Sequence, residues 1–74
     1  MKLLQASIVT EEGDIYQEIE HQGLIVLWFW RQYNANITQI CVDKYAPDDV
    51  IERAYETVAY DYGYTIGDLI SLTK

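Results

Sequence analysis

The chain has 74 residues, of which half are hydrophobic, and its aromatic residues comprise seven Tyr, two Trp and one Phe. Its formal net charge is −7 with only five Lys and Arg, so phosphate backbones and anionic membranes would repel it. One Cys excludes an internal disulfide, and one His with scattered carboxylates offers no zinc-ligand spacing. We therefore expect a single domain, residues 1–74, that binds no metal or cofactor, does not bind nucleic acid directly and does not enter a membrane.

The beginning of the chain does not resemble a secretion signal. Leu3 and Leu4 are followed by Gln5, Ser7 and Glu11 before a long apolar run develops. We therefore expect a cytoplasmic protein, and a bacterial or phage origin is compatible with such a short acidic chain.

Residues 3–45 are predicted to form a four-stranded antiparallel β-meander. Short apolar segments are separated by turns that contain Gly or Asn, which tolerate left-handed backbone conformations. The first segment carries Leu4, Ala6 and Ile8 on one face, with Gln5 and Ser7 on the other. The predicted strands are 3–10, 15–20, 24–33 and 37–45.

Residues 47–62 are predicted to form one amphipathic helix. Pro47 suits the first helical position, and Asp48 and Asp49 complement the positive end of the helix dipole. Gly63 is expected to end the helix just past its last turn. The apolar half of the helical wheel comprises Val50, Ile51, Ala54, Tyr55, Val58, Ala59 and Tyr62.

The last segment, 65–72, is predicted to be either a short helix or a closing strand. Thr65 with Asp68 three residues later has the spacing of a helix capping box and is one possible helix start, and the sequence leaves helix and strand open. The order of elements predicts a two-layer α+β fold, in which the four-stranded β-meander packs on one amphipathic helix.

The strand predicted over 24–33 is apolar on both faces. One helix covers one face of a sheet, so the other face needs a second cover. The C-terminal segment, a second copy of the chain, or a different protein or apolar ligand could supply it. Covering ~400 Å² of apolar surface would contribute about 10 kcal/mol before the costs of association. The two faces comprise Ile25, Leu27 and Phe29 on one side and Leu24, Val26, Trp28 and Trp30 on the other.

The residue types that carry chemistry have ordinary structural explanations here. Cys41 lies mid-strand and is expected to be a buried small hydrophobic residue, while His21 is expected in a solvated turn. A nucleophilic Cys–His pair would require these two places to meet, which a meander disfavours. Of three carboxylate pairs, Glu11/Glu12 falls at a turn and Asp48/Asp49 at the helix start, while Glu18/Glu20 falls in a predicted strand. No glycine-rich phosphate loop is present. We therefore expect no enzymatic activity.

A second contact surface is predicted on the outer side of the helix and in the Tyr-rich run 60–64. Tyr provides contact area at a low entropy cost, and its hydroxyl group can form a hydrogen bond. The alternative is that the acidic helix face is simply solvated. The residues of this surface are Asp49, Glu52, Glu56, Tyr60 and Tyr64.

These features predict a small, acidic, non-catalytic protein-binding or regulatory module that forms a homodimer. The dimer would form through Leu24, Val26, Trp28 and Trp30 on the uncovered sheet face. One alternative is an acidic inhibitor that imitates nucleic acid and blocks a basic groove, using carboxylates along the helix and at the turn 11–14. A second alternative is a binder of small apolar ligands at Trp28 and Trp30.

Overall fold

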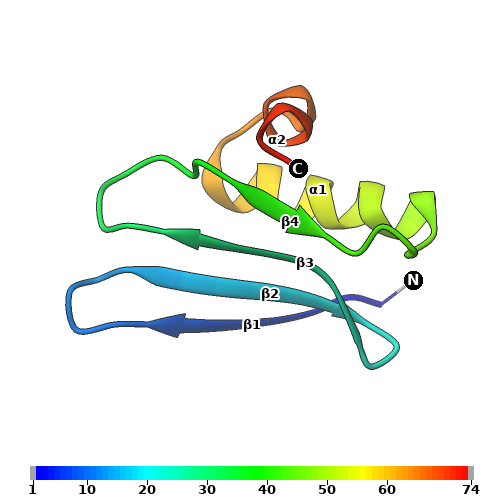
Figure 1. Ribbon diagram of the computed structural model, residues 1–74, viewed down its shortest axis with the longest axis horizontal. Helices are drawn as coiled ribbons and strands as arrows, with labels where there is room; N and C mark the ends of the chain where they lie inside the picture. The colour runs from blue at the N-terminus through cyan, green and yellow to red at the C-terminus, as the bar shows by residue number, and fades with distance from the viewer. Residues whose placement is uncertain (1, 74) are drawn as a thin grey trace.

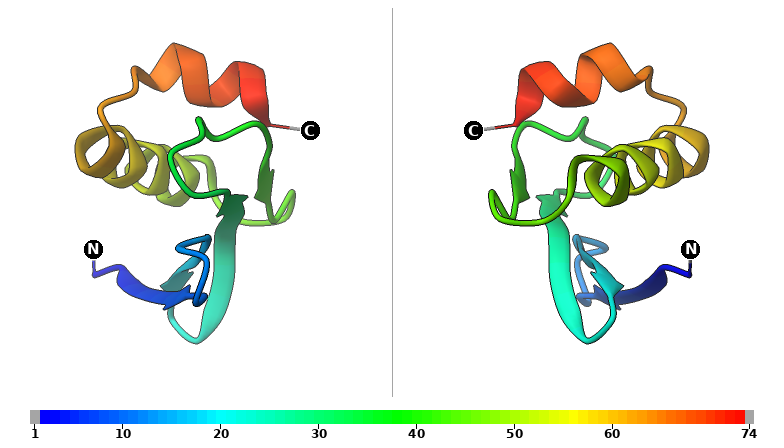
Figure 2. Two further views of the ribbon diagram at one scale, coloured as in Figure 1. Left: turned by 90° about the vertical axis from the view of Figure 1, so that its left-hand side faces the viewer. Right: turned by 90° about the vertical axis from the view of Figure 1, so that its right-hand side faces the viewer.

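The computed structural model describes residues 2–73 and shows a two-layer α+β fold, a four-stranded antiparallel sheet with two helices (Figure 1). The elements are β1 (Leu4–Val9), β2 (Ile15–His21), β3 (Leu24–Arg31), β4 (Ile40–Val42), α1 (Asp48–Tyr62) and α2 (Ile66–Leu72). The strands are neighbours in sequence order, β1-β2-β3-β4, so the predicted β-meander is confirmed. Both helices lie on the same side of the sheet (Figure 2).

The turns of the meander rely on left-handed backbone conformations. The loop between β2 and β3 is formed by Gln22 and Gly23, with φ of 52° and 82°, a geometry that matches the twist of a hairpin. Asn34, in the turn after β3, has φ of 55°. At Gly13, between β1 and β2, a Cβ atom would lie 2.6 Å from Cδ2 of Tyr33, so only glycine fits there without a shift.

β4 is much shorter than the predicted strand 37–45. The backbone on either side of it finds other hydrogen-bond partners. The N–H of Ile37 donates to the hydroxyl of Tyr64 at 2.8 Å, and the N–H of Tyr45 donates to Oδ1 of Asp43 at 2.9 Å. The ladder with β3 covers residues 40–42, and beyond it the N–H of Asp43 donates to the carbonyl of Val26 at 3.0 Å.

The predicted helix is confirmed as α1, with Pro47 at its N-cap position rather than inside its first turn. Gly63 ends it in a left-handed conformation, with φ of 77°, and donates its N–H to the carbonyl of Ala59. The last segment is a helix and not a strand. Thr65 and Asp68 form the expected capping box at the start of α2.

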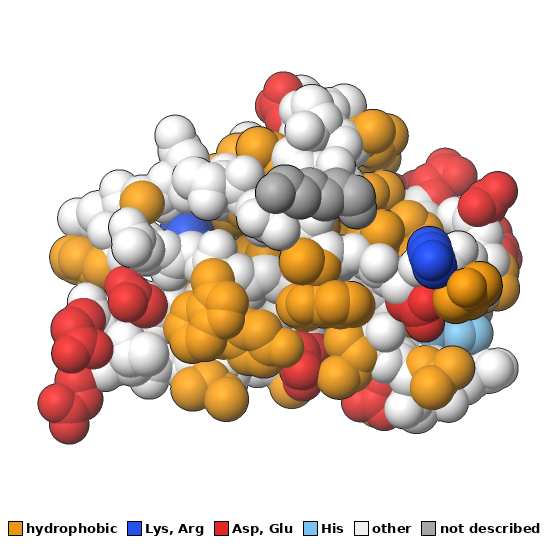
Figure 3. Space-filling view, in the orientation of Figure 1, with side chains coloured by type: hydrophobic (Ala, Val, Ile, Leu, Met, Phe, Trp, Pro, Cys, Tyr) orange, Lys and Arg blue, Asp and Glu red, His pale blue; other side chains and the backbone are white. Residues whose placement is uncertain are grey.

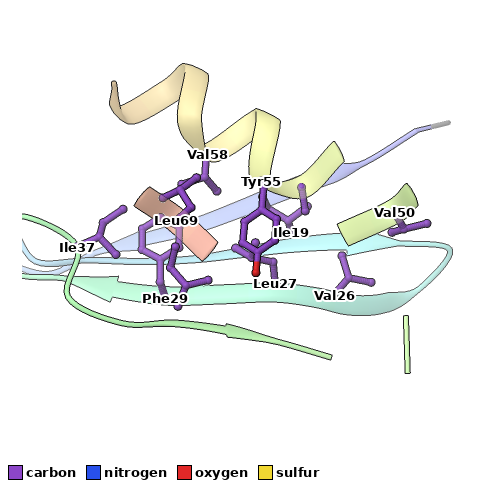
Figure 4. Close-up of a cluster of buried hydrophobic side chains, with 11 residues drawn as sticks. Ile19, Val26, Leu27, Phe29, Ile37, Val50, Tyr55, Val58 and Leu69 are labelled. Atoms are coloured by element: carbon purple, nitrogen blue, oxygen red, sulfur yellow. The ribbon is translucent and has the colours of Figure 1, made fainter. Parts of the chain in front are cut away.

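The hydrophobic core lies between the sheet and the two helices (Figure 4). α1 buries Val50, Ala54, Tyr55 and Val58, and the other residues of its predicted apolar side are partly buried. Leu69 of α2 is fully buried in the same cluster. Both helices therefore cover one face of the sheet, and within residues 2–73 no helix lies on its other face.

Candidate functional site

The face of the sheet that points away from both helices, here called the outer face, carries apolar side chains from all four strands. Ile19, Leu27 and Phe29 are buried toward the helices, so their neighbours along each strand point the other way. Residues directly opposite each other in antiparallel strands share a face. Figure 3 shows hydrophobic side chains gathered over these strands. The outer face comprises Leu4, Ala6, Ile8, Tyr16, Glu18, Glu20, Ile25, Trp28, Trp30 and Cys41.

Much of the outer face is open to solvent. Trp30 is 56% exposed, Ile8 63% and Leu4 52%, while Trp28 and Tyr16 are half-buried. Within residues 2–73, α2 packs beside α1 on the opposite side of the sheet. The C-terminal segment therefore does not provide the cover that was considered from the sequence.

Tyr16 and Trp30 form the aromatic centre of the outer face. Their ring centroids lie 5.1 Å apart, with an angle of 44° between the ring planes. The hydroxyl of Tyr16 donates a hydrogen bond of 2.7 Å to Oε2 of Glu18. This hydrogen bond, assisted by burial and by the negative charge of Glu18, raises the pKa of Tyr16 above its usual value near 10. A carboxylate in the middle of an apolar face thus has one hydrogen-bond donor beside it.

The sequence assigned Val26 to the same face as the two Trp residues, and this assignment is wrong. The register of β2 and β3 shifts between Ile19 and Glu20, which leaves Val26 without a partner on β2. Such a β-bulge breaks the alternation of side chains along the strand. Val26 is consequently only 3% exposed and belongs to the core, while Ile25 lies opposite Glu20 on the outer face.

The other predicted residues of the sheet region occupy separate places. Leu24 is exposed, but it pairs with His21 beside the β2–β3 turn. Cys41, which was expected to be buried, is half-buried on the outer face opposite Trp28. The partners of His21 and Cys41 are four residues apart on β3, roughly 13 Å along the sheet. The structure therefore does not bring His21 and Cys41 together as a nucleophilic pair.

Of the residues predicted to form the contact surface on the outer side of α1 and in the Tyr-rich run 60–64, the structure exposes all except Tyr64. Asp49, Glu52 and Glu56 are exposed on α1, and Tyr60 is 90% exposed. Tyr64 is half-buried against the core, and its hydroxyl accepts the hydrogen bond from Ile37. Tyr64 therefore holds the loop before β4 in place and does not contribute to an open contact surface.

Sequence reasoning missed the contribution of β1 and β2 to the outer face. The alternation of Leu4, Ala6 and Ile8 was visible, but an apolar strand face would ordinarily be placed against the helix. The structure places the polar Gln5 and Ser7 on the helix side instead, opposite Ile19 and Gln17 of β2. The register between β1 and β2 determines which face of the sheet each side chain of β1 occupies. This register cannot be predicted from the sequence of β1 alone.

The described part of the chain contains neither a metal-ligand cluster nor a membrane-spanning helix. Among residues 2–73, no three His, Cys, Asp or Glu side chains lie close enough to hold a metal ion. No helix in that range is both long and apolar enough to cross a membrane. A depression of about 280 Å³ lies on the outer face, lined by Trp28, Phe29, Trp30, Thr38, Gln39 and Cys41.

No protein-family model, curated protein or solved structure matches this chain. Its function is therefore argued from the surfaces that its own fold exposes.

Proposed function

We propose that this chain is a small, non-catalytic protein-binding module that forms a homodimer through the outer face of its sheet. The observation that carries the proposal is the row of Ile8, Tyr16 and Trp30 across three strands, on the side opposite both helices. Soluble monomers rarely expose apolar patches larger than a few hundred Å². A second copy of the same face is a self-complementary cover, as in a two-fold symmetric dimer.

The apolar residues of the outer face come from all four strands of the sheet. Stable interfaces bury roughly 800 Å² per partner. Covering ~400 Å² of apolar surface contributes about 10 kcal/mol, which is within the range of the costs of association.

One of the two carboxylates of the outer face, that of Glu18, already has a hydrogen-bond partner. Glu18 already accepts a hydrogen bond from Tyr16, so its carboxylate would not enter an interface entirely unpaired. Cys41 and Trp28 lie opposite each other across β3 and β4, and both are half-buried. We place the module in the cytoplasm, where the free thiol of Cys41 would stay reduced.

A pair of variants tests the proposal. Trp28→Ser with Trp30→Ser removes both Trp side chains of the outer face and is expected to give a folded monomer by light scattering. Tyr45→Ser with Tyr60→Ser removes two rings that are 84% and 90% exposed elsewhere on the surface, and should leave the dimer intact. A dimer that survives the Trp substitutions, or that is lost in both variants, would contradict the proposal.

A small apolar ligand at the Trp residues is a second candidate, supported by the depression beside Trp28 and Trp30. Its volume of about 280 Å³ lies at the lower limit of the roughly 300–1,000 Å³ typical of ligand pockets. A panel of apolar compounds that quenches Trp fluorescence in the wild type would support this candidate. If no compound changes the Trp fluorescence, this candidate is contradicted and self-association is the function proposed for the outer face.

The carboxylates do not favour an inhibitor that imitates nucleic acid. The β1–β2 turn, with Glu11 and Glu12, lies at one end of the molecule, and α1 begins at the other end (Figure 1). Arg53 also interrupts the acidic residues of α1. A phosphate mimic would require a more continuous acidic face.

A further inference from the structure

The free edge of β1 is the most unusual surface that the dimer proposal leaves unused. β1 is an edge strand that, among residues 2–73, pairs only with β2, in a register with no bulge. All six of its residues are exposed. Natural edge strands are blocked by charged residues, Pro, bulges or a covering segment. The sequence of β1, LQASIV, contains no charged residue and no Pro. Its outward N–H and C=O groups are therefore open to pairing with another strand.

A groove runs beside this edge, between the helix side of β1 and α1. It has a volume of about 470 Å³ and is lined by Gln5, Arg53, Glu56, Thr57, Tyr60 and Asp61. A second hollow of about 360 Å³ shares Arg53 and Glu56 and is also lined by Asp49 and Glu52. The first hollow, here called the β1–α1 groove, carries the carboxylates of Glu56 and Asp61 and the guanidinium group of Arg53. The second hollow lies along α1 and adds the carboxylates of Asp49 and Glu52. Figure 2 shows β1 extending on the same side of the molecule as α1.

Charge decides against a second copy of the chain at this edge. Antiparallel pairing of β1 with β1 of a second copy requires a two-fold axis perpendicular to the joined sheet. This symmetry places both α1 helices on the same side, with their acidic flanks facing each other. Like charges would then repel across the junction, in a chain whose net charge is already −7. A partner with basic side chains would instead be attracted to this acidic flank of α1.

We propose that the free edge of β1 and the β1–α1 groove bind an extended basic segment of another protein, which adds to the sheet as a fifth strand. Side chains of an added strand alternate between the two faces of the sheet. Those on the helix side meet the carboxylates of Glu56 and Asp61, and those on the other side continue the apolar row of Leu4 and Ile8. The segment that fits is one in which Lys or Arg alternates with Val or Ile. The site goes beyond the homodimer, because the segment binds along the free edge of β1 and reaches the outer face only beside Leu4 and Ile8.

Peptide binding tests the chemistry of the segment. A short fluorescent peptide in which Lys and Val alternate is expected to bind the wild type at low salt, with an affinity that falls as salt is added. A peptide of the same composition with Lys and Val in separate blocks should bind about tenfold more weakly, as should an alternating peptide whose backbone amides are methylated. Absence of binding, or equal binding of all three peptides, would overturn the addition of a strand.

Charge reversal on the protein tests the location of the site. Glu56→Lys with Asp61→Lys is expected to weaken the alternating peptide about tenfold. Glu11→Lys with Glu12→Lys makes the same change of charge at exposed positions outside the groove, and should have a much smaller effect. Equal weakening by both pairs would mean non-specific attraction to an acidic protein and would overturn the proposed site.

The Trp28→Ser and Trp30→Ser variant separates this site from the dimer interface. It should bind the alternating peptide as tightly as the wild type, whether or not the wild type is a dimer. Loss of peptide binding in this variant, with its circular dichroism unchanged, would place the peptide on the outer face and overturn the inference. A higher assembly that grows with added salt and is dissociated by the peptide would assign the edge to a second copy, and would also overturn it.

Discussion

The hydroxyl of Tyr62 in α1 donates a hydrogen bond of 2.6 Å to Oε1 of Gln17 in β2, 45 residues earlier in the chain. Gln17 is only 4% exposed, and its Nε2 donates in turn to Oε1 of Gln5 in β1 at 2.6 Å. The Tyr62 ring also packs edge-on against Phe29, with 5.4 Å between the ring centroids. These contacts tie the last turn of α1 to β1, β2 and β3. They hold the helix over one face of the sheet, which leaves the outer face free.

Replacing Tyr62 by Phe should lower the free energy of unfolding by about 1–3 kcal/mol, because the buried Gln17 oxygen loses its donor. Urea denaturation of the wild type and the variant measures this difference. Tyr60→Phe is the matched control, since Tyr60 is 90% exposed and should show no change. Equal stability of all three proteins would mean that the Tyr62–Gln17 hydrogen bond does not contribute to stability.

A second substitution should repair much of this loss. In a chain with both Tyr62→Phe and Gln17→Leu, apolar groups replace both partners and no buried donor or acceptor is left unpaired by the change. Gln5 is exposed and can turn to water. The double variant is therefore expected to be more stable than Tyr62→Phe alone. A strictly additive destabilisation would show that the two side chains act independently.

Stability should decline in alkali partly through Tyr62. Burial raises the pKa of Tyr62 above its usual value near 10; the Arg31 guanidinium opposes this shift and Asp61 adds to it. A raised pKa in the folded state means that the neutral phenol is favoured by folding. This contribution is complete below pH 10 and is lost as the pH rises through the higher pKa of the folded state. The stability difference between wild type and Tyr62→Phe should therefore narrow above pH 10, and a constant difference would contradict this.

Reversing the charges of Glu52 and Glu56 to Lys should change the free energy of unfolding by less than about 0.5 kcal/mol. Both residues are exposed on α1, where charges interact weakly through water. Thermal denaturation at moderate salt measures the effect. A decrease of several kcal/mol in the free energy of unfolding would mean that these carboxylates make stabilising contacts in the folded protein and are not simply solvated.

The rate at which the Cys41 thiol is labelled indicates whether the outer face is covered. It is half-buried opposite Trp28, so a dimer that covers this face should shield its thiol. The rate of thiol labelling is expected to fall as the protein concentration rises. In the Trp28→Ser and Trp30→Ser variant the rate should not depend on concentration. A wild-type rate that is the same at all concentrations would argue against a covered outer face.

The periodicity of residues 50–62 predicted α1 well, whereas helix and strand were both left open for the segment 65–72. α1 follows the apolar positions from Val50 to Tyr62, and Gly63 ends it because a residue without Cβ adopts a positive φ most easily. The spacing of Thr65 and Asp68 indicated the start of α2. These signals are local, so they can be read from neighbouring residues without knowledge of the rest of the fold.

The faces of the sheet could not be predicted in the same way. The bulge at Val26 depends on how β3 pairs with β2, and it moves one predicted contact residue into the core. Tyr64 was predicted to be a contact residue, but it accepts a hydrogen bond from Ile37, 27 residues away. Both corrections arise from tertiary pairing, for which a single sequence contains no local signal.

Light scattering on a sizing column, over a range of protein concentrations and at two salt levels, is the experiment to perform first. The proposed homodimer predicts twice the mass of one chain, with little change between the salt levels, because apolar contacts are not screened by ions. A monomer at every concentration would contradict self-association through the outer face.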